Sequence, residues 1–82
     1  MSKKSIHLHY YALLKEERGV VQETLETTAA TALELYQELQ VKYKFKLSVG
    51  ILKVAINNEF TDWSKPLKDG DQLILIPPVA GG

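Results

Sequence analysis

One segment of the chain is long enough to form a helix that covers a β-sheet, and this limits the folds available to the sequence. Thr31-Ala32-Leu33-Glu34 matches a capping box, in which the Thr31 hydroxyl accepts from the Glu34 amide and the Glu34 carboxylate reaches back. Apolar residues then recur at helical spacing, at Ala32, Leu35, Leu39 and Tyr43 or Tyr36. We expect a helix over about residues 32–43, then a loop, although residues 41–47 alternate as a strand would.

The remaining apolar residues follow the period of two that is typical of half-buried strands. Ile6, Leu8 and Tyr10 show it most clearly, and we expect strands over residues 5–12, 20–26, 51–56, 59–61 and 72–76. A helical turn or two over residues 13–19 ends at Gly19. Asn57-Asn58 favours a tight hairpin turn.

This order of elements predicts an α+β fold of the β-grasp (ubiquitin-like) type, with a mixed four- to five-stranded sheet packed on one main helix. We expect one β-grasp domain over residues 1–78 and a flexible tail over residues 79–82. Pro77 and Pro78 mark the boundary, because neither proline can donate to a strand ladder.

The last strand is apolar on both of its faces. In Leu73-Ile74-Leu75-Ile76, alternate side chains point to opposite faces, and one helix covers only one face of a sheet. We expect Ile74 and Ile76 to face away from the helix, where Tyr11 and Phe60 join them. Scattered exposed apolar residues are common on proteins, but we interpret these four as a contiguous patch that a partner covers.

The overall composition excludes several classes of function. Ten lysines and arginines balance ten aspartates and glutamates, so the sequence predicts neither a nucleic-acid binder nor a basic helix on a membrane surface. No apolar run is long enough to span a membrane, and the start of the chain does not resemble a secretion signal. The chain has no cysteine, which removes disulfides and thiolate chemistry and fits a cytoplasmic protein.

Three groups of polar residues could be mistaken for sites. His7 and His9 lie on one face of a strand, but two histidines without a third ligand are better read as surface residues, so we expect no metal. Lys42, Lys44 and Lys46 are expected in a solvated loop. Asp69 and Asp71 flank Gly70, where they are expected to stabilise a turn.

The C-terminal tail carries the most unusual functional group of the chain. Val79-Ala80-Gly81-Gly82 tapers in side-chain size and can extend roughly 13 Å beyond Pro78. Such a peptide can enter a narrow tunnel in which a Cβ atom would clash. The terminal carboxylate could then be adenylated and converted to a thiocarboxylate. The alternative is a disordered end with an incidental pair of glycines.

Three segments resemble a known family. YYALLKEERG (10–19), VAINNEFTDWSKPLKDGDQL (54–73) and IPPVAGG (76–82) are similar to the small subunit of molybdopterin synthase, a sulfur carrier of the ThiS-like β-grasp family. The resemblance covers nearly the full chain, although residues 39–50 match poorly. Gln72 stands where an acidic residue is commoner, and Tyr10-Tyr11 where phenylalanines are frequent.

The resemblance implies a cycle of sulfur transfer. An E1-like adenylating enzyme would use ATP to activate Gly82, which would then carry sulfur as a thiocarboxylate. The tail would enter the large subunit of molybdopterin synthase and give sulfur to cyclic pyranopterin phosphate. Gly81 would provide clearance, and residues Pro77, Pro78, Val79 and Ala80 would set the reach of the tail.

The same resemblance places the catalytic groups in the large subunit of a heterotetramer. This chain would act as the small subunit of a sulfurtransferase complex, with no catalytic site and no bound cofactor of its own. Two alternatives remain open. The chain could carry sulfur for thiamine biosynthesis or tRNA thiolation, or act as a ubiquitin-like modifier. It could also be a non-catalytic β-grasp interaction module.

Overall fold

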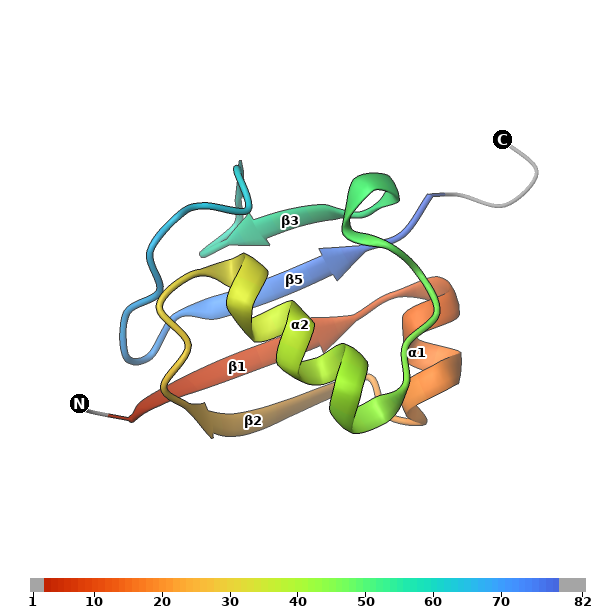
Figure 1. Ribbon diagram of the computed structural model, residues 1–82, viewed down its shortest axis with the longest axis horizontal. Coiled ribbons are helices and arrows are strands. Elements are labelled where there is room, and N and C mark those ends of the chain that lie inside the picture. Colours follow the sequence, from red (N-terminus) through yellow and green to blue (C-terminus); the bar gives the residue numbers. More distant parts are fainter. Residues whose placement is uncertain (1–2, 79–82) are drawn as a thin grey trace.

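The computed structural model describes residues 3–78 and contains five strands, two α-helices and a short 3-10 helix (Figure 1). In chain order these elements are β1 (Lys4–Tyr10), α1 (Ala12–Arg18), β2 (Gln22–Thr27), α2 (Ala32–Tyr43), the 3-10 helix (Val49–Ile51), β3 (Lys53–Ile56), β4 (Glu59–Thr61) and β5 (Gln72–Ile76). The five strands and two α-helices match the element types expected from the sequence, whereas the 3-10 helix was not expected.

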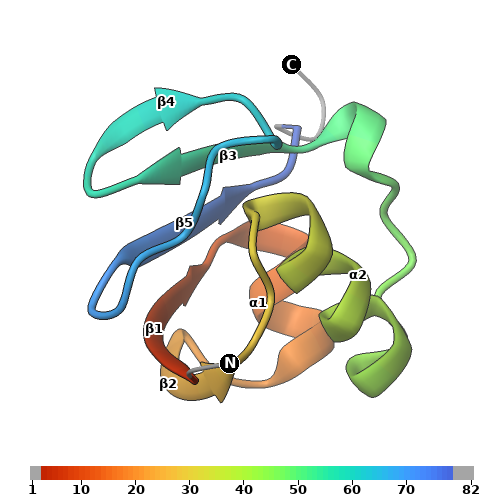
Figure 2. The same cartoon turned by 60° about the vertical axis from the view of Figure 1, so that its left-hand side comes forward.

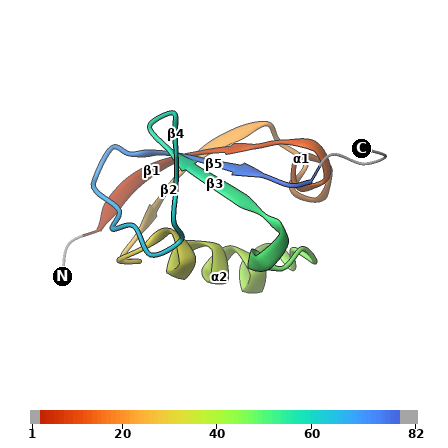
Figure 3. The same cartoon turned by 90° about the horizontal axis from the view of Figure 1, so that it is seen from above.

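The strands form one mixed sheet in the order β2-β1-β5-β3-β4. β1 and β5 run parallel at its centre, and the other neighbours are antiparallel. Figure 2 shows β4 at the edge beyond β3, and Figure 3 shows α2 lying across one face of the sheet. The prediction of an α+β fold with one main helix on a mixed sheet is confirmed.

The ends of α2 are set by local sequence. The Thr31 hydroxyl accepts a hydrogen bond from the Glu34 amide at 3.2 Å, as the capping box predicts. The Glu34 carboxylate accepts from the Ala30 amide at 3.2 Å, one residue before the cap. Lys44 ends the helix in the left-handed conformation, with φ +58°. The helix buries Ala32, Leu35, Tyr36 and Leu39 against the sheet.

The core lies between α2 and the inner face of the sheet. Its alternating side chains come from the three central strands: Ile6, Leu8 and Tyr10 of β1, Leu73 and Leu75 of β5, and Val54 and Ile56 of β3. Phe45, in the loop after α2, is also buried, with its ring centroid 5.8 Å from that of Tyr10 and 6.1 Å from that of Tyr36. The alternation over residues 41–47 therefore reflects a helix end and one anchored loop residue.

Three expected strand boundaries were wrong, each for a local reason. The first strand ends at Tyr10, since Ala12 has φ +52° and already starts α1. β2 starts at Gln22, after the exposed Val20 and Val21. The third strand starts at Lys53, because residues 49–51 form the 3-10 helix, in which the Leu52 amide donates to the Val49 carbonyl at 3.2 Å.

The turns behave as the sequence predicts. Asn57 and Asn58 have φ of +53° and +72°, as a two-residue hairpin turn requires. Asp69 accepts from the Ser5 amide at 2.7 Å. Asp71 accepts from the Lys68 amide at 2.8 Å and from the Asn57 side chain at 2.9 Å. The hydrogen bonds of the two aspartates therefore stabilise the turn that precedes β5.

The two faces of β5 should differ sharply in their contribution to stability. Leu75 is fully buried, so Leu75→Ala should lower the free energy of unfolding by about 2–5 kcal/mol. Ile74 is only partly buried on the outer face, so Ile74→Ala should cost about 1 kcal/mol. Urea unfolding of the two variants measures both values, and equal losses would contradict this assignment of the two faces.

Candidate functional site: the outer sheet face at the base of the tail

The strand register places an apolar row on the face of the sheet that α2 does not cover. Ala55 of β3 is opposite Phe60 on one side and Ile74 on the other. Ile74 is in turn opposite His9 of β1. Ala55 is buried even though it lies outside the core cluster. Phe60, by contrast, is 71% exposed.

A second apolar row lies nearer the end of β5. Ile76 is opposite Lys53 and is partly buried. Tyr11 follows directly after the pairing of Tyr10 with Leu75 and keeps an extended backbone, so it lies level with Ile76 on the outer side. Tyr11 is 47% exposed. The structure thus places the four expected patch residues, Tyr11, Phe60, Ile74 and Ile76, on one face of the sheet.

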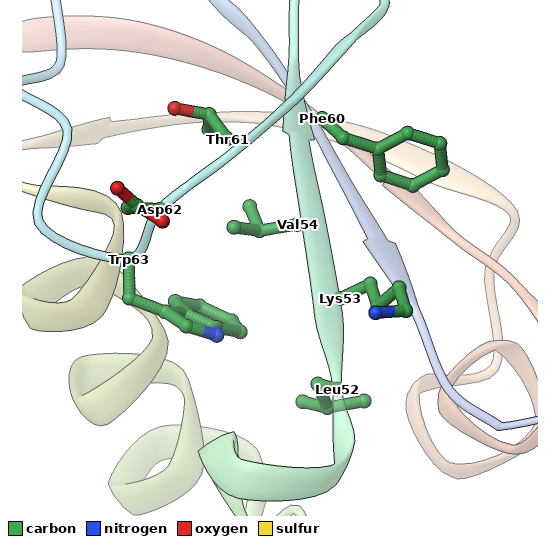
Figure 4. A pocket seen from close by; sticks show the side chains of 7 residues that line it. All are labelled: Leu52, Lys53, Val54, Phe60, Thr61, Asp62 and Trp63. Atoms are coloured by element: carbon green, nitrogen blue, oxygen red, sulfur yellow. The ribbon is translucent and has the colours of Figure 1, made fainter.

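Two hollows lie at the β3 side of this face. The larger, of about 420 Å³, lies at the edge of β3 (Figure 4). Lys53 and Phe60 lie on one side of the β3 ribbon in that view, and Val54 and Trp63 on the other. The smaller, of about 280 Å³, is lined by Ile51, Lys53, Ile76, Pro77 and Pro78, at the base of the tail.

The larger hollow exists because β4 is short. After Thr61 the chain leaves the sheet and caps α2, where the Trp63 carbonyl accepts from the Leu33 amide at 3.0 Å and the Lys65 carbonyl accepts from the Ala32 amide at 3.3 Å. β4 therefore pairs with β3 only from Val54 onward, and the start of β3 has an open edge.

The polar residues of the outer face form no metal site among residues 3–78. His7 is exposed, and its Nδ1 shares a hydrogen bond with the Thr24 hydroxyl at 2.8 Å. Within these residues no group of three or more histidine, cysteine or acidic side chains could hold a metal ion. The helices in this part of the chain are too short or too polar to cross a membrane.

The tail itself lies outside the described residues. This applies to Val79, Ala80, Gly81 and Gly82, whose expected roles remain predictions. The structure does place the base of the tail, since Pro77 is buried and Pro78 is exposed. The tail therefore leaves from the end of the central strand, beside Ile76 of the outer face.

Sequence reasoning missed a polar cluster at the same end of the sheet. The Tyr10 hydroxyl donates to the Glu23 carboxylate at 2.5 Å, and Arg18 donates to both of its oxygens, at 2.8 and 3.0 Å. The Arg18 guanidinium also lies 4.0 Å from the centroid of the Tyr43 ring. The cluster fastens α1 to β2 and α2. Its members come from four separate segments, and no local motif in the sequence identifies them.

The environment of the cluster alters its ionisation. Burial opposes the charge on Glu23, but hydrogen bonds from Arg18 and Tyr10 outweigh burial and hold the pKa of this carboxyl below its usual value of 4.5. Burial and the neighbouring Glu23 raise the pKa of Tyr10. Tyr10 is thus a neutral donor and Glu23 a charged acceptor at neutral pH. Glu23 also lines a hollow of about 310 Å³ with His7 and His9, but Tyr10 and Arg18 occupy both of its carboxylate oxygens, so we interpret the arrangement as structural.

The central parallel pair, the single covering helix and the strand that ends in a tail define a ubiquitin-like β-grasp domain. Comparison with known proteins agrees. The model of the ThiS family matches residues 8–82, and the chain belongs to the ThiS family.

The relatives of this chain include named sulfur carriers. It is 32% identical over 80 residues to the molybdopterin synthase sulfur carrier subunit of Haemophilus influenzae, covering 94% of this chain and 99% of that protein. It is 30% identical over 82 residues to the Drosophila melanogaster protein of the same name, covering 95% of this chain and 91% of the relative.

Among solved structures, similarity extends to a protein–protein complex of subunits 1 and 2 of molybdopterin-converting factor from Helicobacter pylori. A chain of that complex is 33% identical, with a TM-score of 0.64, covering 95% of this chain and 99% of the other. The small archaeal modifier protein 1 of Methanosarcina acetivorans has a TM-score of 0.78 and full coverage of both chains. At 21% identity, the latter shows the fold alone.

The Glu23 cluster should make stability depend on acid. The folded-state pKa of Glu23 is lowered, so its stabilisation is present above pH 4.5 and is lost as the pH falls through the folded-state value. At neutral pH, Glu23→Gln should lower the free energy of unfolding by about 1–3 kcal/mol, and this loss should shrink at acidic pH. Urea unfolding across the pH range measures the effect.

Glu26→Gln is the matched control for this prediction. Glu26 lies on the same strand with an exposed side chain, so its replacement should change stability little. A loss for Glu23→Gln that stayed constant down to pH 3 would contradict the charged role of Glu23.

Proposed function

We propose that this chain is a sulfur carrier for molybdopterin biosynthesis, and that the carboxylate of Gly82 is its working group. Activation by an E1-like enzyme would join this carboxylate to AMP from ATP and release pyrophosphate. Sulfide would then attack the acyl carbon, AMP would leave with the C–O bond that breaks, and a thiocarboxylate would remain. The proposal places this chemistry in the cytoplasm, and the domain itself would bind no cofactor.

The observation that carries the proposal is membership of the ThiS family through to residue 82, together with relatives named as molybdopterin synthase sulfur carrier subunits. The absence of a side chain at Gly81 and Gly82 suits attack at a crowded acyl carbon. The lack of cysteine in the sequence means that no thiol of this chain competes for the activated acyl group.

We propose the large subunit of molybdopterin synthase as the acceptor partner. In support, a relative of this chain occurs in a complex of subunits 1 and 2 of molybdopterin-converting factor. The apolar outer face also adjoins the base of the tail through Ile76, so a protein that receives the tail would meet Ile76 and, further along this face, Phe60. The sulfur would pass from Gly82 to cyclic pyranopterin phosphate in that subunit.

The tail should tolerate no extension. One alanine added after Gly82 should abolish thiocarboxylate formation. The C-terminal carboxylate would then belong to a residue with a side chain and would lie one residue further from the domain. The melting temperature should stay unchanged. Intact-protein mass spectrometry after incubation with ATP, the activating enzyme and a sulfur source should show the oxygen-to-sulfur exchange, a gain of about 16 Da, in the natural chain only.

A variant that lacks Gly81 and Gly82 completes this test. It should fold normally and fail to gain sulfur. If the truncated chain restored molybdopterin synthesis in a strain without the natural protein, the chain would be an interaction module. If the natural chain gained sulfur but supported only thiamine synthesis or tRNA thiolation, it would serve another acceptor.

The outer face should matter for binding more than for folding. Phe60→Asp and Ile76→Asp should each weaken binding to the large subunit by about tenfold or more, since a carboxylate would be buried against apolar surface. Calorimetric titration measures the affinity. Val41→Asp is the matched control, because Val41 is 81% exposed on α2, and it should bind normally. Unfolding of Phe60→Asp would show instead that Phe60 belongs to the core.

A further inference from the structure

Lys53 is the one lysine among the described residues that lines both hollows of the site. Its partner across β3 and β5 is Ile76, and its side chain lies on the same side of the β3 ribbon as Phe60 (Figure 4). Within the described part of the chain, the Lys53 ammonium has no ion pair, since the salt bridge found there joins Arg18 and Glu23. A charge thus sits between two apolar depressions.

The geometry around Lys53 restricts what can dock there. Phe60 and Trp63 are the large apolar residues that line the larger hollow. Ile76, Pro77 and Pro78 line the smaller one. Lys53 is exposed, so a docked surface that fills both hollows would lie against its side chain and would remove water from the ammonium. Burying an unpaired ammonium is strongly unfavourable, whereas a paired one is tolerated. The Asp62 carboxylate lines the larger hollow but lies beyond Val54 from Lys53 in Figure 4.

We propose that the tail-receiving partner presents a carboxylate to Lys53, flanked by two apolar side chains that enter the two hollows. The inference rests on the proposed function, because the partner that takes up the tail is the one whose surface meets Pro77 and Pro78. It adds the chemistry of the docking segment, an acidic residue between two apolar ones. The apolar pair supplies affinity, and the ion pair sets the register of the tail.

Lys53→Met and Lys53→Arg separate charge from size in calorimetric titrations with the large subunit of molybdopterin synthase from the same organism. Lys53→Met should bind about tenfold more weakly or worse, because the partner's carboxylate is left buried and unpaired. Lys53→Arg should bind within about threefold of the natural chain, and Lys53→Glu should be weakened about 100-fold or more. Raising the salt concentration should weaken the natural complex more than that of Lys53→Met.

Lys46→Met is the matched control, since Lys46 is exposed in the loop after α2, and it should bind normally. Equal or tighter binding by Lys53→Met would overturn the inference, as it would show that no carboxylate faces the ammonium. Failure of the natural chain to bind the large subunit would overturn both the inference and the proposed partner. The sulfur gain at Gly82 is measured without the large subunit, so it tests the tail chemistry separately.

Discussion

The structure depends on the fact that a single helix covers one face of a five-stranded sheet. α2 buries the inner side chains of β1, β5 and β3, and β5 lies at the centre with a neighbour on each side. On the inner face Leu73 and Leu75 are fully buried. The other face has no helix above it in the described part of the chain, so Ile74 and Ile76 are shielded only by adjacent side chains. One arrangement thereby produces both the core and the apolar outer surface.

The central place of β5 also determines how the tail is presented. Hydrogen bonds to β1 on one side and β3 on the other fix the strand up to Ile76, and Pro77 is buried just beyond it. The last described residues therefore leave the sheet in a defined direction. The Glu23 cluster supports the same end of the molecule, because it fastens α1 beside the end of β5 (Figures 1 and 3).

Much of this could be predicted from sequence, because the deciding signals are local. The capping box located α2, the alternation of Ile6, Leu8 and Tyr10 located β1, and Asn57-Asn58 located the hairpin. The misplaced strand ends arose where backbone geometry overrode side-chain pattern, as at Ala12 and the 3-10 helix.

What could not be predicted depends on contacts between distant segments. In the sequence, Phe45 is part of an alternating run that does not indicate burial. Phe45 is buried because it packs against the rings of Tyr10 and Tyr36, which come from distant segments. The pairing of Tyr10 and Arg18 with Glu23 requires the register of β1 and β2. The position of Lys53 between two hollows requires knowledge of where β4 ends, and that end is set by hydrogen bonds to α2.

Under the proposed function, the position of Lys53 beside the base of the tail is important. A tail of four residues reaches roughly 13 Å, so any protein that takes its end into an active site must rest against the domain around Pro78. Ile51, Lys53 and Ile76 line the hollow beside that point, so the scaffold would contact the partner during sulfur delivery and would give it a surface by which to position the carboxylate.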